Sequence, residues 1–150
     1  MRSFILDTNV VSAFAPGRHG KPPSDPAVSA WIRQNEDNLF LSAITPLEIE
    51  AGLLKLGRVS PGRWHTEMVK WFDVFLEQFT DRVLPLDLSV ARSAAKIADR
   101  NAAQGLDPGL PDIVIAATTI AHGMTLLTRN LRHFIASGVS AVDPFEQLPP

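Results

Sequence analysis

The sequence near its start is Phe4-Ile5-Leu6-Asp7-Thr8-Asn9, in which three apolar residues lead directly into an acid and two small polar residues. A short apolar run that ends in turn-forming residues predicts a buried strand. The same pattern returns four times along the chain. Further strands are predicted at 39–41, at 83–86, where Pro85 favours a sheet edge, at 125–127 and at 140–142.

Proline and glycine mark the helices between these strands, because proline fits the first turn of a helix and glycine the position just past its end. Helices are predicted from Asp25-Pro26, from Thr45-Pro46 to Gly57, from Ser60-Pro61, from Ser89 to Gly105, and from Pro111 to Gly123. The segment from Pro16 to Pro26 is predicted to be a loop. Strands that alternate with helices indicate an α/β fold with a parallel sheet, whose ligands bind beyond the carboxyl ends of the strands.

Large apolar residues at helical spacing follow Ser60-Pro61 in the predicted third helix. They are Trp64, Met68, Trp71, Phe72, Phe75, Leu76 and Phe79. Such a face could stack on nucleic acid bases, but it is more typical of a protein core or a subunit contact. We therefore expect this face to pack in the core and in a dimer interface.

The composition limits the kinds of function that are possible. A chain of 150 residues, 45% of them hydrophobic, predicts one domain spanning residues 1–150. The absence of cysteine excludes disulfides, thiolate zinc sites and cysteine nucleophiles. No signal peptide pattern and no apolar run of roughly 20 residues is present, so we expect a cytoplasmic protein without membrane contact. With a net charge of −2, binding a polyanion would need a local basic patch or a bound cation.

Three acids and an amide stand at equivalent places in this pattern. Asp7 comes directly after the first strand, and Glu48 lies in the first turn of the helix after the second. Asp112 lies in the first turn of the helix before the fourth strand, and Asn130 follows that strand. A parallel sheet would bring them together at its carboxyl edge. Clustered carboxylates repel one another unless a cation is present, and oxygen ligands suit Mg²⁺ or Mn²⁺, so a metal site that acts on phosphate esters is predicted.

Each acid also has a structural explanation. Asp7 could cap a short helix that follows it. Glu48 lies three residues after Thr45, which is the spacing of a capping box. Asp112 in a first turn is favoured by the helix dipole. Independent capping does not require all three acids to fall at the same edge, however, so together they favour a site.

Four ordered motifs carry a family resemblance over essentially the whole chain. They are Leu6-Asp7-Thr8-Asn9; Ser42 through Leu47-Glu48-Ile49 to Gly52; Leu110-Pro111-Asp112-Ile113 with Ile115-Ala116-Ala117; and His122-Gly123 through Leu127-Thr128-Arg129-Asn130 to Phe134. In this order and spacing the chain resembles the PIN-domain ribonucleases of the VapC or FitB toxin type. The resemblance implies a three-layer α/β/α fold with a parallel sheet of four to five strands. It also implies cleavage of RNA by a metal-activated water, homodimers, and a cognate antitoxin that blocks the site.

The resemblance also implies roles for particular residues. Asp7 and Asp112 would be ligands of Mg²⁺ or Mn²⁺, and Glu48 would be a ligand or would orient the attacking water. Further groups are expected to hydrogen-bond the carboxylates or contact the substrate: Thr8, Thr128, Arg129 and Asn130. Arg129 could instead pair with a carboxylate.

The chain departs from the family pattern at one corner of the site. Many relatives have a fourth acid at or just after the segment that matches Thr128-Arg129-Asn130, whereas this chain has Asn130 and then His133. An amide binds a divalent cation less strongly than a carboxylate, so we expect one retained metal, or a second that arrives with substrate. His133 could touch substrate phosphate, although placement on the surface is the expectation. The missing acid also keeps open a rival function, a PIN-like module without strong catalytic activity that binds RNA or a protein.

Overall fold

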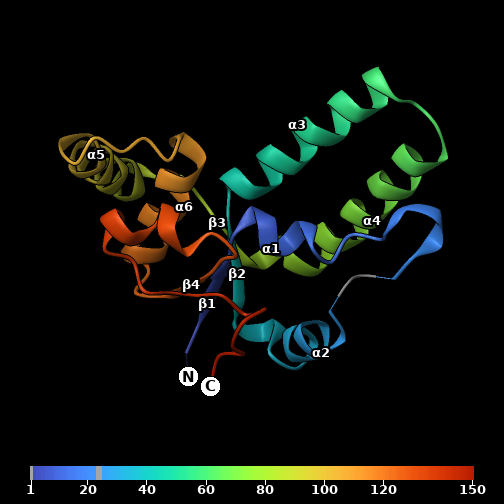
Figure 1. Ribbon diagram of the computed structural model, residues 1–150, viewed down its shortest axis with the longest axis horizontal. Coiled ribbons are helices and arrows are strands. Elements are labelled where there is room, and N and C mark those ends of the chain that lie inside the picture. Colours follow the sequence, from blue (N-terminus) through green and yellow to red (C-terminus); the bar gives the residue numbers. More distant parts are fainter. Residues whose placement is uncertain (1, 23–24) are drawn as a thin grey trace.

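The computed structural model describes residues 2–22 and 25–150, and five parallel strands in this part of the chain form one sheet (Figure 1). The strands are β1 (Phe4–Leu6), β2 (Leu39–Ser42), β3 (Val83–Leu84), β4 (Thr125–Leu127) and β5 (Ala141–Val142). Their order is β3-β2-β1-β4-β5. The predicted α/β class and parallel pairing are therefore confirmed, and the strand that precedes Pro85 lies at a sheet edge as predicted.

Helices cover both faces of the sheet, because alternate residues of each strand point to opposite sides. Phe4 and Leu6 of β1 pack on one face with α1 (Thr8–Ser12), α2 (Pro26–Gln34) and α4 (Arg63–Phe79). Ile5 packs on the other face with α5 (Leu88–Ala103) and α6 (Leu110–Ala121). The result is the three-layer α/β/α arrangement that the resemblance implies.

A helical hairpin of α3 (Ile44–Val59) and α4 projects from the end of the sheet (Figure 1). The prediction that α3 ends at Gly57 is wrong, since the helix continues to Val59. Gly57 instead lets α4 approach, because a Cβ atom there would lie 2.6 Å from Nε2 of His65. The α4 helix begins at Arg63, two residues later than the proline signal indicated.

The aromatic face of α4 belongs largely to the core. Phe72 and Phe79 are buried, and Trp71 and Phe75 are partly buried against the cluster that includes Phe4 and Leu6. The core part of the prediction for this face is therefore confirmed, and its part in a dimer stays a prediction.

Five short 3-10 helices lie between the strands and α-helices of the described residues, and one of them falls in the segment that was expected to be a loop. They are η1 (Arg18–Gly20), η2 (Glu36–Asn38), η3 (Thr80–Arg82), η4 (Leu131–His133) and η5 (Ile135–Ser137). Residues 23 and 24 of the predicted loop from Pro16 to Pro26 lie outside the described residues. Within 2–22 and 25–150, no helix has the length and apolar character needed to cross a bilayer.

Candidate active site

Asp7 lies at the carboxyl end of β1, where backbone pairing with β4 fixes it. Its N–H donates to the carbonyl of Leu127 (2.9 Å), and its side chain is only 4% exposed. The N–H of Thr8 donates to Oδ1 (2.7 Å), which makes Asp7 the N-cap of α1. The hydroxyl of Thr128 donates to Oδ2 (2.7 Å) and itself accepts from the N–H of Asn130 (3.0 Å). Both carboxylate oxygens are thus held in place, so capping and a place in the site coexist in this residue.

The environment of Asp7 disfavours its negative charge. Burial raises the pKa of Asp7 from 3.8 to about 6, and the nearby charges of Asp112 and Glu48 act in the same direction. The hydrogen bonds from Thr128 and Thr8 oppose this rise and do not cancel it. A buried carboxylate between two further acids is stabilised by a cation, which is the electrostatic situation that the sequence pattern predicts.

Glu48 lies in the second turn of α3, and the structure excludes the capping-box explanation for it. The helix begins at Ile44 with Ala43 at the N-cap position, so Thr45 is inside the helix and cannot cap it. The expected position of Glu48 in the first turn was wrong for the same reason. Thr45 is fully buried, and its hydroxyl lies 3.0 Å from that of Thr8.

The side chain of Glu48 is directed to the site by a residue 40 positions earlier in the chain. The hydroxyl of Thr8 donates to Oε1 of Glu48 (2.7 Å). Thr8 therefore connects the acid on α3 with the segment that follows β1, and the second oxygen of Glu48 can interact with water or a cation.

Replacing Glu48 with glutamine is expected to lower RNA cleavage by at least about 100-fold and to change the free energy of unfolding by less than about 0.5 kcal/mol. The amide retains an oxygen that can accept from Thr8, but it loses the charge. Cleavage rates and urea unfolding measure the two effects. Glu50→Gln, an exposed position on the same helix, is the matched control. A variant that loses stability but keeps its rate would contradict a place for Glu48 in the site.

Asp112 lies in the first turn of α6, as predicted, and its partner is His133. Nδ1 of His133 lies 3.0 Å from Oδ2 of Asp112, and the two side chains are 46% and 23% exposed. His133 therefore has the expected exposed position and, in addition, contacts an acid of the site. Asn130 lines the site, and its backbone N–H rather than its side chain makes the hydrogen bond to Thr128. No sequence signal pointed to the contact with Asp112, because the two residues are 21 positions apart and His133 lies in a 3-10 turn.

Arg129 lines the same hollow as the acids. Its guanidinium carbon is 4.5 Å from the ring centroid of Phe145, and its backbone N–H donates to Oδ1 of Asn9 (3.2 Å). The ion pairs found in residues 2–22 and 25–150 do not include Arg129, so the alternative of a pairing with a carboxylate is not seen there. Its charge can face an incoming phosphate.

The predicted residues border one open hollow of about 490 Å³ at the carboxyl edge of the sheet. It is lined by Asp7, Thr8, Asn9, Ser12, Ala13, Glu48, Asp112, Arg129 and Asn130. Thr128 is fully buried, and its hydrogen bond to Asp7 connects it to this hollow. The structure thus brings three acids to one surface: Asp7 at the end of β1, Glu48 of α3 and Asp112 of α6.

The donor chemistry of this hollow fits a hard divalent cation. The three acids offer only oxygen, which Mg²⁺ and Mn²⁺ prefer. No arginine or lysine of the described ranges forms an ion pair with them, so their charge lacks a protein cation. As the side chains stand, the same ranges contain no group of three acidic or imidazole side chains compact enough to be a ready metal cage. Each acid is instead held by its own partner, namely Thr128, Thr8 or His133.

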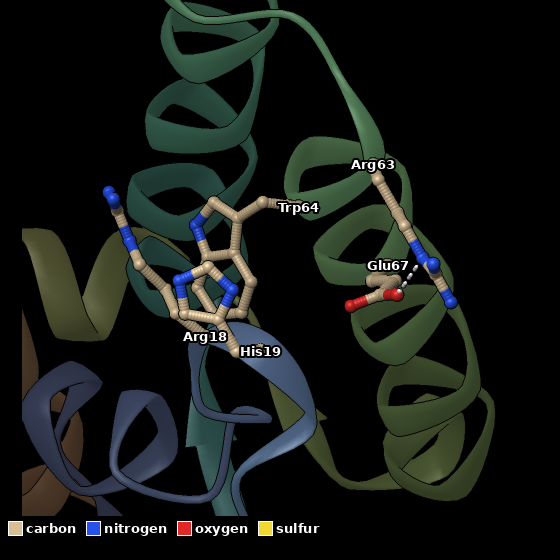
Figure 2. A pocket seen from close by; sticks show the side chains of 5 residues that line it. All are labelled: Arg18, His19, Arg63, Trp64 and Glu67. Atoms are coloured by element: carbon tan, nitrogen blue, oxygen red, sulfur yellow. Dashed lines mark hydrogen bonds and ion pairs between the residues drawn. The ribbon is translucent and has the colours of Figure 1, made fainter.

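A second hollow, of about 470 Å³, lies by the α3–α4 hairpin and has a different character (Figure 2). Figure 2 shows Arg18 and His19 beside Trp64, with the guanidinium of Arg18 5.8 Å from the indole centroid. Arg63 and Glu67 of α4 also line this hollow and form an ion pair (3.0 Å). Its lining is thus mainly basic and aromatic, with one carboxylate that is already paired, in contrast to the three acids of the first hollow.

The fold and the acidic edge define a three-layer α/β protein with an oxygen-only candidate metal site. The sequence model of the PIN domain matches residues 4–137, and the chain belongs to this family.

Comparisons with known proteins agree over nearly the full length. The chain is 36% identical to VapC ribonuclease Y4jK of Sinorhizobium fredii, covering 95% of this chain and 97% of that protein. It is 32% identical to toxin FitB of Neisseria gonorrhoeae, covering 94% and 97%. The crystal structure of FitAcB from Neisseria gonorrhoeae superposes with a TM-score of 0.78 at 30% identity, covering 95% of this chain and 98% of that chain. The predicted family and fold are confirmed.

Proposed function

We propose that this chain is a Mg²⁺- or Mn²⁺-dependent ribonuclease that hydrolyses phosphodiester bonds of RNA. The observation that carries the proposal is the convergence of Asp7, Glu48 and Asp112 on one hollow, with Asp7 buried at its base. Burial, which raises the pKa of Asp7, agrees with a site that needs a cation. The similarity to a protein named VapC ribonuclease supports RNA as the substrate.

The residues of the hollow would have different roles in the hydrolysis. Asp7 and Asp112 would hold the cation. Asp7 accepts a hydrogen bond at each carboxylate oxygen, and Asp112 has one oxygen in contact with His133. A bound divalent cation supplies Lewis-acid activation of water and neutralises charge on the phosphate. Glu48, fixed through Oε1 by Thr8, orients the attacking water and can accept its proton at the other oxygen. Arg129, stacked on Phe145, contacts a phosphate of the RNA.

We also propose that this chain is the toxin of a toxin–antitoxin pair. The similarity to a protein named toxin FitB supports this assignment, with a cognate antitoxin that covers the hollow. A homodimer and a cytoplasmic location complete the proposal. Exposed apolar side chains such as Leu88 (74%) and Ile135 (76%) are available for protein contacts.

Purified protein, separated from any antitoxin by denaturation and refolding, is expected to cleave single-stranded RNA only with Mg²⁺ or Mn²⁺ present. A fluorogenic RNA measures the rate, and EDTA followed by excess Mn²⁺ tests reversibility. The same preparation with Ca²⁺ serves as a control for ionic effects. Cleavage that is unchanged by EDTA would contradict the metal mechanism.

The rival function is a module that binds RNA or protein without strong catalysis. Measuring the melting temperature with Mn²⁺, alongside RNA cleavage, distinguishes it from the enzyme. Binding of a cation to the folded state raises the melting temperature by mass action. A rise in melting temperature with Mn²⁺ but no RNA cleavage under any metal would favour the rival. A rise together with cleavage supports the enzyme.

A further inference from the structure

His133 lies beside Asp112 of the acidic hollow, on a backbone segment that hydrogen bonds and a buried neighbour hold in place. It closes η4, where its N–H donates to the carbonyl of Asn130 (3.0 Å). Before η4, the N–H of Asn130 is fixed by the hydroxyl of Thr128 (3.0 Å). Directly after it, Phe134 is 2% exposed in the core, and its N–H donates to Leu131 (3.0 Å). An anchor on each side therefore sets the position of the backbone that carries the imidazole.

The imidazole acts on one acid of the hollow. Nδ1 of His133 and Oδ2 of Asp112 are 3.0 Å apart. An ionised carboxylate only accepts hydrogen bonds, so Nδ1 carries the proton and donates. The contact joins η4 to the first turn of α6, two elements that the chain separates by 21 residues. An acid at position 133 would repel Asp112, whereas an imidazole N–H stabilises it without adding negative charge.

We propose that His133 is a positioning residue that fixes the carboxylate of Asp112 for binding of the catalytic cation. This inference rests on the proposed function. Holding Oδ2 by a hydrogen bond restricts rotation of the carboxylate and leaves Oδ1 for the cation. Loss of such a supporting hydrogen bond typically weakens metal affinity or activity by about 10–100-fold. His133 thus serves at the corner of the site where no fourth carboxylate stands.

The test measures Mn²⁺ affinity by isothermal titration calorimetry, together with kcat and KM for RNA. His133→Ala is expected to weaken Mn²⁺ binding about 10–100-fold and to lower the rate at limiting Mn²⁺, with KM for RNA at saturating Mn²⁺ unchanged. His133→Asn is expected to restore the affinity to within a few-fold of wild type, because its side-chain N–H lies near the place of Nδ1. His133→Gln, whose amide lies one carbon further out, should restore less.

His122→Ala is the matched control. His122 lies at the other end of α6, by the hollow that Ser3 and Thr125 line at the amino ends of β1 and β4. The Mn²⁺ affinity of the His122→Ala protein should equal that of wild type. His133 is partly exposed, so its variants should fold, and melting temperatures without metal within a few degrees of wild type would verify this.

Three outcomes would overturn the inference. Wild-type Mn²⁺ affinity in His133→Ala would show that Asp112 needs no such support. A raised KM for RNA with unchanged Mn²⁺ affinity would make His133 a substrate contact. Equal losses in His133→Asn and His133→Ala would show that the ring itself, not the N–H, is required. Failure of the wild-type protein to bind Mn²⁺ or cleave RNA would instead count against the proposed function.

Discussion

Asp7→Asn is expected to abolish RNA cleavage and, without metal, to stabilise the folded protein. The loss, at least about 100-fold in rate, follows from removing the charge of a proposed cation ligand. The gain in stability follows from the buried position of the carboxylate, because the neutral amide avoids the cost of burying a charge beside Asp112 and Glu48. A substitution that disables an enzyme while stabilising it is difficult to explain unless the residue is retained for function.

The raised pKa of Asp7 determines how the stability of the wild-type protein changes with pH. Burial raises the pKa of Asp7 from 3.8 to about 6, so the folded protein holds the proton more tightly than the unfolded chain does. The contribution of Asp7 to stability is therefore lost as the pH rises from about 4 to about 6. The full loss is about 3 kcal/mol in metal-free protein, as an order of magnitude.

Urea unfolding of both proteins in EDTA, from pH 4 to pH 7, measures the effect. The free energy of unfolding of Asp7→Asn minus that of wild type should increase across this range. Asp37→Asn, at an exposed position, should show no such trend and is the control. A difference in the free energy of unfolding that stays constant with pH would show that the charge of Asp7 does not destabilise the folded protein.

Asp112→Asn is expected to reduce RNA cleavage by at least about 100-fold without a comparable gain in stability. Asp112 is more exposed than Asp7, so its charge costs the folded state less, and the asparagine oxygen can still accept from His133. Calorimetric titration should show weakened Mn²⁺ binding, and circular dichroism should be unchanged.

Asp99→Asn is the control for this variant, since Asp99 is exposed on α5 next to α6. It should retain wild-type rates and Mn²⁺ affinity. Full cleavage by Asp112→Asn in the presence of EDTA would rule out the metal mechanism.

The strands and most helices were predictable from the sequence, because their signals are local, whereas the three layers were implied by the family resemblance. Asp25 caps α2 directly before Pro26, and the run after Pro111 is helical as the flanking residues indicated. Gly57 was misread because a glycine that ends a helix and a glycine that admits a neighbouring side chain look alike in sequence. Only the packing of His65 on α3 distinguishes them.

The convergence of the three acids was predictable, because each lies at the end of a strand or near the start of a helix, and these ends meet at one edge of the sheet. Their hydrogen-bond partners were harder to predict from the residues alone. The bond between Thr8 and Glu48 joins positions 40 residues apart, and that between His133 and Asp112 depends on a 3-10 turn with no hydrophobic period. Such contacts are set by tertiary packing.

The central claim is that this protein cleaves RNA with a divalent cation that Asp7 and Asp112 hold, while Glu48 orients the attacking water. Its most direct test is a Mn²⁺ titration of EDTA-stripped wild-type protein in which calorimetric binding and RNA cleavage are followed at the same concentrations. The account predicts that cleavage is absent before Mn²⁺ is added, that it rises in step with binding, and that Asp7→Asn shows neither. Cleavage before any Mn²⁺ is bound, or undiminished binding and cleavage in Asp7→Asn, would contradict it.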